Sequence, residues 1–268
     1  LSSANSINWG RLVPQIVYYF AAYAQLLKAG QIALGDAVDF CVPTGNFGDI
    51  LAGYYAKQMG LPVGKLVCAS NENNVLTDFL TTGTYTARRA FYKTTSPSMD
   101  ILVSSNLERL LYHVTGSDTE VASLMKQLNE TGSYTVRPET LAAIQESFAC
   151  GWSSEAQVAE EIRARYEQDR YLCDTHTAVA FHVAAQHKRD GVPMVVLSTA
   201  SPFKFPRSVL EALGHAAPAN DFEAMQQLEE ATGCTAPASL SALRQKAERF
   251  HTVIDPEQIA QVALRYQA

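Results

Sequence analysis

Cysteine is scarce in this sequence and follows no pattern. The five cysteines, Cys41, Cys68, Cys150, Cys173 and Cys234, are scattered through 268 residues without a CxxC spacing. An odd and dispersed set of this kind indicates buried free thiols in a cytoplasmic protein. It excludes a disulfide framework, and no metal site is predicted.

The sequence also lacks a long hydrophobic run and an excess of positive charge. Its longest apolar stretch, IVYYFAAYA at 16–24, falls far short of the roughly 20 residues that a membrane-spanning helix requires. Lysine and arginine number 21 against 27 aspartates and glutamates, which gives a net charge of -6 with no dense basic stripe. Neither a membrane nor a nucleic acid is therefore predicted as a partner.

The beginning of the chain lacks the usual features of a protein start. It opens LSSANSINWG, without an initiating methionine and without the charge pattern of a signal peptide. We therefore expect a fragment or processed chain of a larger protein.

Short apolar segments predict the strands of a parallel sheet. The candidates are VDFCVP at 38–43, KLVCAS at 65–70, PMVVLS at 193–198 and, more weakly, DILVSS at 100–105. Brief runs of β-branched and aromatic residues between turn residues are typical of strands that are buried on both faces. A helical stretch ended by Gly60 and Pro62 separates the first two, so residues 38–70 predict a strand–helix–strand unit and an α/β fold.

Apolar residues at steps of three and four predict helices elsewhere in the chain. One long helix is expected from residue 12 to 27, followed by Gly30 as its stop, and three more are expected after residue 198. Residues 105–170 are expected to be helical, with apolar faces at 107–114, 121–128, 141–148 and 158–166. Ser154 with Gln157 has capping-box spacing, and Asp255 followed by Pro256 predicts the start of the last helix.

The segment PTGNFGD at 43–49 lies directly after a predicted strand and directly before a predicted helix. Unpaired backbone N–H groups at a helix start can converge on a phosphate, and the helix dipole favours the same ligand. Gly45 is expected to allow a positive φ, and Gly48 a close approach of the ligand. The spacing is neither a P-loop nor GxGxxG, so the residues alone leave anion binding and a plain turn equally open, with Asp49 slightly favouring the turn.

Three further polar clusters have both a structural and a functional interpretation. Ser198, Thr199 and Ser201 follow a predicted strand, where they can bind a heterocycle or, more commonly, cap the helix near Pro206. Asp174 is a predicted N-cap, and His176 beside it is more often structural than catalytic. NSINWGRL, with Asn5, Ser6, Asn8 and Arg11, can bind a second anion, although helix capping needs only one of these residues.

Taken together, these segments resemble the threonine synthase family, pyridoxal-phosphate (PLP) enzymes of fold type II, the tryptophan-synthase-β-like fold. The segments that carry the resemblance, in the family's order, are SINWGRL (6–12), PTGNFGDILAGYYAKQMGLP (43–62), NENNVLTDFLTTG (71–83), SPSMDILVSSNLERLL (96–111), DTHTAV (174–179) and STASPFKFP (198–206). They extend over most of the chain, and their combined specificity is high.

The resemblance implies an α/β fold, a partial parallel-sheet sandwich of the fold type II PLP-enzyme kind with a large helical insertion and C-terminal helices. It implies three parts. Residues 1–104 would form part of the PLP-binding domain with the phosphate loop, 105–170 the helical insertion, and 171–268 the remainder of the PLP-binding domain and the C-terminal helices.

The resemblance also implies roles for individual residues. Thr199 would meet the pyridine nitrogen of the cofactor, and a hydroxyl there leaves the ring a milder electron sink than a carboxylate would. The cofactor phosphate would be held by the backbone of Gly45, Asn46, Phe47, Gly48 and Asp49. The phosphate of the substrate, O-phosphohomoserine, would be faced by Asn5, Ser6, Asn8 and Arg11.

The implied reaction converts O-phosphohomoserine and water to L-threonine and phosphate by β,γ-replacement, and it needs a lysine as Schiff-base partner and proton carrier. The family's lysine lies in a Phe-Lys-Asp segment that these residues lack, and Lys204 belongs to the matched motif at 198–206. The Schiff-base lysine is therefore expected upstream of Leu1. No catalytic residue is assigned within the chain, which is expected to be inactive alone.

Two alternatives remain open at this stage. One is a related fold type II lyase, such as a dehydratase or a phospholyase-like enzyme, although SINWGRL and the insertion at 105–170 favour the synthase. The other is a non-catalytic fragment whose glycine loop binds any small anion. Because a sheet without its neighbouring strands exposes an edge, self-association or marginal stability is also predicted.

Overall fold

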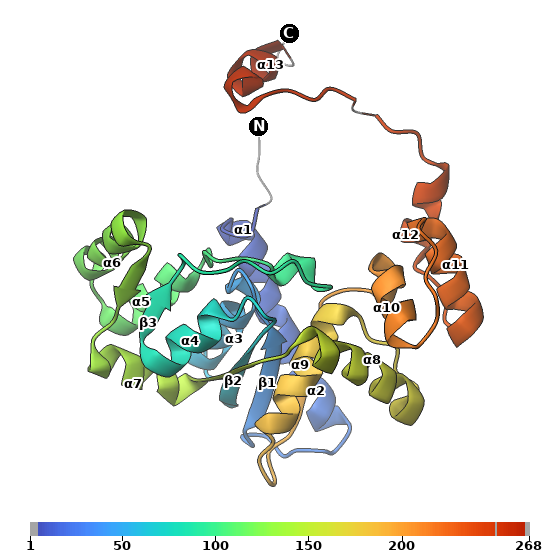
Figure 1. Ribbon diagram of the computed structural model, residues 1–268. Helices are drawn as coiled ribbons and strands as arrows, with labels where there is room; N and C mark the ends of the chain where they lie inside the picture. The colour runs from blue at the N-terminus through green and yellow to red at the C-terminus, as the bar shows by residue number, and fades with distance from the viewer. Residues whose placement is uncertain (1–4, 250, 266–268) are drawn as a thin grey trace. The chain divides into compact units, whose positions relative to one another are not determined.

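The computed structural model describes residues 5–249 and 251–265, and the chain divides into two units, one ending at Cys234 and the other beginning at Thr235. The larger unit is built on a four-stranded sheet (Figure 1), in the spatial order β5-β2-β1-β6 with every neighbouring pair parallel. Its strands are β1 (Val38–Pro43), β2 (Val63–Ser70), β5 (Phe148–Trp152) and β6 (Met194–Val196). The predicted α/β fold with a parallel sheet is confirmed.

Helices cover both faces of this sheet. The helices of the larger unit are α1 (Trp9–Leu12), α2 (Ile16–Lys28), α3 (Gly48–Gln58), α4 (Val75–Thr82), α5 (Leu107–Thr115), α6 (Asp118–Thr131), α7 (Pro138–Ser147), α8 (Glu155–Asp169), α9 (Thr175–Gln186), α10 (Pro206–Ala212) and α11 (Asp221–Thr232). Phe40 and Leu66 belong to the core that includes residues of α2, α3 and α4, whereas Cys41 on the opposite face donates to the carbonyl of Ala180 in α9 at 3.2 Å. Every residue of β1 is buried, as the continuous apolar run predicted.

The smaller unit contains α12 (Ala238–Ser241) and α13 (Ile259–Arg265), with 3-10 turns at Ala242–Gln245 and Pro256–Gln258. Asp255 and Gln258 form a capping box at the second turn, so the predicted start of the last helix is confirmed.

The capping box predicted for Ser154 and Gln157, in the larger unit, is also present, at the start of α8.

Two predictions of local structure are wrong. The segment 100–105 is not a strand, because the carboxylate of Asp100 accepts from Asn71, Asn73 and Thr94 and holds the chain in an irregular turn. Phe148 does not continue a helix; α7 ends at Ser147, and Phe148 begins β5, which pairs with β2. Pairing with a neighbouring strand outweighed the local helical spacing.

Other differences are smaller. The long helix expected from residue 12 is divided, because α1 passes into a 3-10 turn at Val13–Gln15, which contains Pro14, before α2 begins. A two-stranded antiparallel sheet, β3 (Thr84–Thr86) with β4 (Ser133–Thr135), was not predicted.

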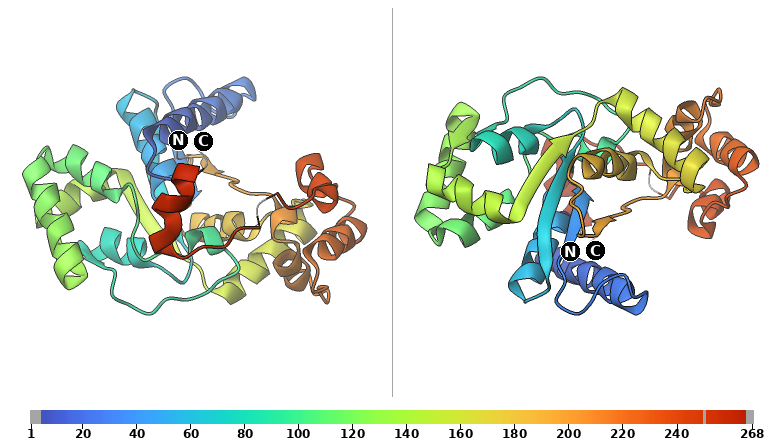
Figure 2. Two further views of the ribbon diagram at one scale, coloured as in Figure 1. Left: turned by 90° about the horizontal axis from the view of Figure 1, so that it is seen from above. Right: turned by 90° about the horizontal axis from the view of Figure 1, so that it is seen from below.

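Helices α5 to α7 gather beyond the β5 side of the main sheet (Figure 2). The boundaries proposed at 104 and 170 stay predictions, although β5 shows that 105–170 is not helical throughout.

The strand β6 lies at one edge of the main sheet. Among the described residues, no strand pairs with its outer edge, and all three of its residues are half-buried. Self-association through this edge stays a prediction. Within the ranges 5–249 and 251–265, no helix has the length and apolar character to cross a bilayer.

Candidate functional site

A cavity of about 640 Å³ lies where β1 and β6 end. Its lining contains Ser6 and Arg11 near the start of the chain, and Thr199 after β6. It also contains the whole predicted phosphate loop, Gly45, Asn46, Phe47, Gly48 and Asp49. Asn5 and Asn8 do not belong to the lining. The carboxyl ends of parallel strands are the usual place for a ligand in this kind of sheet, and most of the predicted site residues meet there.

The backbone of the loop differs from the prediction at one position. Phe47, and not Gly45, has the left-handed conformation, with φ 57° and ψ 2° at the N-cap of α3. This conformation is costly for a bulky residue and persists only where the surroundings impose it. Here the ring of Phe47 is 1% exposed and packs 5.6 Å from that of Phe148. The buried ring therefore holds the strained turn in place.

Gly45 is required for a different reason. A Cβ at this position would lie 3.1 Å from both Met99 Cα and the carbonyl oxygen of Ser98. These atoms belong to residues 96–106, which we call the strap. The strap also holds the loop further along, where Ser104 Oγ donates to the carbonyl of Gly45 at 2.7 Å. Gly45 thus allows the strap to pack directly against the loop.

The loop carries a set of unpaired donors. Among the described residues, none accepts a hydrogen bond from the backbone N–H groups of residues 45–49. These residues line the cavity at the start of α3, an eleven-residue helix. Of these five residues Phe47 is buried and the others are half-buried, and a helix start with unpaired N–H groups favours an anion electrostatically. The loop therefore has the chemistry of a phosphate cup.

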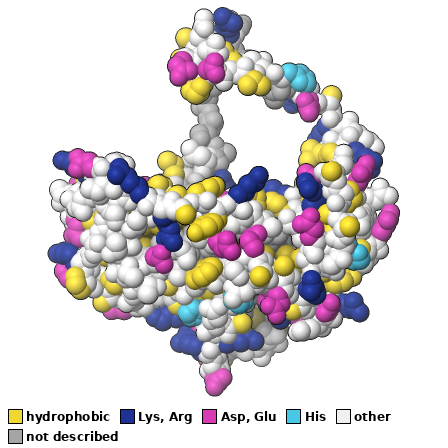
Figure 3. Space-filling view, viewed as in Figure 1, with side chains coloured by type: hydrophobic (Ala, Val, Ile, Leu, Met, Phe, Trp, Pro, Cys, Tyr) yellow, Lys and Arg dark blue, Asp and Glu magenta, His cyan; other side chains and the backbone are white. Residues whose placement is uncertain are grey.

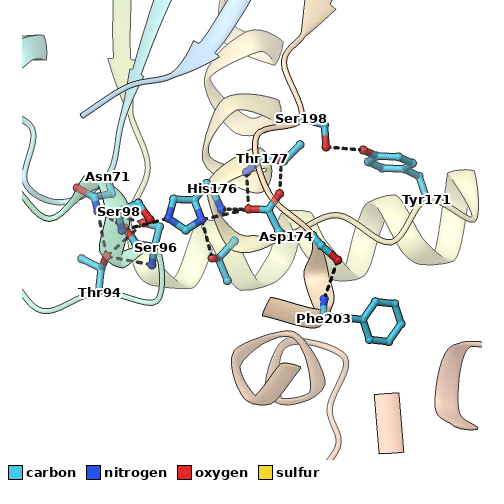
Figure 4. Close-up of polar contacts among 12 residues, drawn as sticks. Asn71, Thr94, Ser96, Ser98, Tyr171, Asp174, His176, Thr177, Ser198 and Phe203 are labelled. Atoms are coloured by element: carbon cyan, nitrogen blue, oxygen red, sulfur yellow. Dashed lines mark hydrogen bonds and ion pairs between the residues drawn. The ribbon is translucent and has the colours of Figure 1, made fainter. Parts of the chain in front are cut away.

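A buried polar network behind the cavity fixes the strap (Figure 4). His176 Nε2 accepts from the backbone N–H of Ser98 at 3.2 Å, so the hydrogen-bond network assigns the ring proton to Nδ1, which donates to Asp174 Oδ1 at 3.1 Å. Burial alone would raise the pKa of Asp174, but the hydrogen bonds from His176 and Thr177 outweigh it and lower that pKa. The structural interpretation of His176 is supported, and its ring also forms part of the cavity wall.

The polar residues after β6 have separate roles. Ser201 accepts from the backbone N–H of Phe203 at 3.3 Å and caps the 3-10 turn Pro202–Lys204, and Ser198 Oγ accepts from the hydroxyl of Tyr171 at 3.2 Å. The capping interpretation therefore holds for Ser201, although the capped turn begins before Pro206. Thr199 is exposed and belongs to the cavity lining, where a ligand can reach it.

The residues of the segment that precedes α1 also have separate roles. Asn8 caps α1 by accepting from the N–H of Gly10 at 2.9 Å. Ser6, in contrast, reaches the strap, where its hydroxyl lies 2.9 Å from that of Ser105. Residues 104–106 were missed by the sequence analysis as site residues, because their partners lie far away in the chain.

Asp49, in the first turn of α3, is an acid with a raised pKa in the cavity lining. Tyr19, which is fully buried, donates its hydroxyl to the Asp49 carbonyl at 2.8 Å and lies 3.2 Å from Asp49 Oδ1. Burial raises the pKa of Asp49 to about 6, and the hydrogen bond from Tyr19 opposes this only in part. The folded protein therefore holds a proton on Asp49 more tightly than the unfolded chain does.

This shift predicts a pH-dependent gain in stability on replacing Asp49 with asparagine. Because the folded pKa of about 6 exceeds the ordinary aspartate pKa of 3.8, wild-type stability falls as the pH rises between these values. Asp49→Asn removes that loss, so its advantage should be absent at low pH and reach at most about 3 kcal/mol above neutrality. Urea unfolding of both proteins across this pH range measures the difference. A constant difference at every pH would contradict the assignment.

The cavity lining includes one lysine, Lys204. Lys204 is exposed, whereas Lys57 and Lys65 donate to backbone carbonyls at 2.8 Å, of Gly64 and Gln145 respectively. In the part of the chain that the structure describes, no group of three or more His, Cys, Asp or Glu side chains could hold a metal ion.

Comparison with known proteins identifies what the chain is similar to. A family profile described as "Threonine synthase, C-terminal" matches residues 177–263. The chain is 45% identical over 215 residues to human "Threonine synthase-like 1", covering 80% of this chain and 29% of that protein. It is 41% identical over 220 residues to the threonine synthase of Methylobacillus glycogenes, covering 80% of this chain and 46% of that protein.

Solved structures give the same result. A PLP-bound threonine synthase from Brucella melitensis matches with a TM-score of 0.84 and 41% identity, covering 99% of this chain and 53% of that one. The yeast threonine synthase matches with a TM-score of 0.83 and 32% identity, covering 98% and 53%. The chain thus spans about half the length of the threonine synthases that it matches.

The fold and the matched structures place the chain in the class of fold type II PLP enzymes. Within this class it belongs to the threonine synthase family, and it corresponds to the C-terminal part of the family's members.

Proposed function

We propose that this chain forms one side of a PLP site and acts as the C-terminal part of a threonine synthase that converts O-phosphohomoserine and water to L-threonine and phosphate. One observation carries the proposal. The unpaired N–H groups of residues 45–49 share a single cavity with Thr199 and with Ser6 and Arg11.

The residues present fit the cofactor. The loop supplies backbone donors for its phosphate, and the absence of a Cβ at Gly45 lets the strap support the loop from behind. Thr199 supplies a hydroxyl for the ring nitrogen. PLP, when bound, supplies an electron sink for the amino-acid substrate.

Ser6 and Arg11 are the residues that we propose for the substrate phosphate. Both line the cavity, and a guanidinium with a hydroxyl suits a phosphate group. For Asn5 and Asn8 the same role stays a prediction, and the amide oxygen of Asn8 is already engaged as a helix cap. The proposed substrate is a small molecule. On the face shown in Figure 3, acidic and basic side chains are interspersed. All five cysteines are free thiols, which agrees with a cytoplasmic location.

We further propose that the catalytic lysine lies outside these residues and that the chain does not turn over substrate alone. Lys204 is the candidate that the cavity itself offers. Its side chain is exposed, and its Nζ lies 5.5 Å from the centroid of the Phe205 ring.

Incubation with PLP, borohydride reduction and peptide mapping test this proposal. We expect PLP to raise the melting temperature more than equimolar inorganic phosphate does, without stoichiometric pyridoxyl labelling of Lys204. Stoichiometric labelling of Lys204 would show that the reactive lysine is in this chain. Equal protection by inorganic phosphate would instead favour a general anion-binding fragment.

The remaining alternative, a related lyase, differs in its product. The full-length parent protein, given O-phosphohomoserine, should release phosphate and threonine in equal amounts. Phosphate without threonine would identify a phospholyase-like enzyme.

A further inference from the structure

Two neighbouring residues of the strap, Ser105 and Asn106, connect the two parts of the site. Ser105 Oγ lies 2.9 Å from Ser6 Oγ and donates to Asn46 Oδ1 at 3.1 Å. Asn106 Nδ2 donates to the carbonyl of Ser6 at 3.0 Å and to that of Asn46 at 2.8 Å. Two parallel hydrogen-bonded paths therefore join Ser6 to Asn46, and we call them the 105–106 bridge.

The orientation of Asn106 is fixed by its surroundings. The side chain is 1% exposed, and its Oδ1 accepts from the guanidinium of Arg109, which also donates to the carbonyl of Ile7 at 2.8 Å. With the oxygen committed to Arg109, the amide nitrogen faces the two carbonyls, and each of its two hydrogens has one acceptor. Both hydrogens of the amide are therefore used, one on each segment, and a movement of either segment alone breaks one of these hydrogen bonds.

We infer that the 105–106 bridge couples two anion-binding segments, so that a phosphate bound at residues 45–49 favours a second phosphate bound at Ser6 and Arg11, and the reverse. The inference rests on the proposed function, which assigns the two phosphates to these segments. Ordering one segment orders the other through the bridge, so the second ligand meets a segment that is already in position. Ser105 and Asn106 are positioning residues, because they act through Ser6 and Asn46.

Calorimetric titration of this chain with two probes measures the coupling. Pyridoxine phosphate occupies the loop and, having no aldehyde, cannot attach to a lysine; O-phosphohomoserine occupies the second segment. The coupling factor is the ratio of the affinities for O-phosphohomoserine with and without saturating pyridoxine phosphate. Repulsion between the two phosphates acts equally in all variants, so the bridge is measured by the change in this factor between variants.

Ser105→Ala removes one path of the bridge, and Asn106→Leu removes the other. We expect each to lower the coupling factor, with a total reduction of about fivefold or more when both are changed. Ser104→Ala is the matched control, because the Ser104 hydroxyl donates to Gly45 in the loop and contacts neither Ser6 nor Asn46. It should weaken pyridoxine phosphate binding and leave the coupling factor unchanged. Ser105→Ala keeps the test valid if Asn106→Leu fails to fold.

The outcomes separate the bridge from the proposed function. A coupling factor in Ser105→Ala equal to that of the wild type, or an equal loss in Ser104→Ala, overturns the bridge and leaves the two binding sites standing. A wild-type chain that binds neither probe contradicts the proposed function, and the bridge with it.

Discussion

Replacing Asp174 with alanine is expected to lower the free energy of unfolding by about 3–5 kcal/mol. The carboxylate is fully buried, and Oδ1 accepts from the backbone N–H of His176 at 2.8 Å and from its ring Nδ1 at 3.1 Å. Oδ2 accepts from the hydroxyl of Thr177. Alanine would leave the backbone N–H of His176 and the hydroxyl of Thr177 buried without partners, at a cost of about 1–3 kcal/mol each before relaxation. It would leave the ring Nδ1 with the Thr175 hydroxyl alone, at 3.3 Å, and would remove the N-cap of α9.

Asn220→Ala is the matched control for this prediction. Asn220 caps α11 through two backbone N–H groups, those of Phe222 and Glu223, but at an exposed position. Its loss should cost only about 1 kcal/mol. Urea unfolding of both variants gives the comparison. Similar losses for the two would show that Asp174 acts as an ordinary helix cap and does not support a buried network.

The turn at residues 44–47 and its two flanking elements, β1 and α3, were predictable because their signals are local. The run at 38–43 has a strand's length and composition, and Gly45 with Gly48 marks the passage into a helix. Even here the backbone detail was missed, since the left-handed residue is Phe47. A buried aromatic contact with Phe148, distant in the chain, stabilises that conformation, and no local pattern reveals it.

The strap could not be predicted for the same reason. DILVSSN has strand-like composition, yet Ser104, Ser105 and Asn106 bind the loop and the start of the chain through side chains. Hydrogen bonds between distant segments have no sequence period. Phe148 shows the converse, because its helical spacing was real and the pairing of β5 with β2 overrode it.

Replacing Gly45 with alanine is expected to weaken pyridoxine phosphate binding by at least about tenfold, or about 1.4 kcal/mol. The new Cβ would lie 3.1 Å from Met99 Cα and from the Ser98 carbonyl oxygen, both of which are backbone atoms. Ser98 cannot move freely, because its backbone N–H donates to His176 Nε2 at 3.2 Å. The loop must therefore move away, which displaces its N–H groups from the phosphate, and stability should fall by about 1–3 kcal/mol.

Gly48→Ala distinguishes this steric effect from a general loss of glycine in the loop. A Cβ at Gly48 would have Asn106 Nδ2 as its nearest neighbour at 3.4 Å, an ordinary contact, so stability should stay within about 0.5 kcal/mol of the wild type. If Gly45→Ala lost stability but bound pyridoxine phosphate normally, the loop and strap would be a packing unit only, and the phosphate would have to bind elsewhere. If it stayed folded, with reduced stability, and also lost affinity, the position of the loop against the strap would be shown to control the site. The second result is the one that the clamped Ser98 backbone predicts.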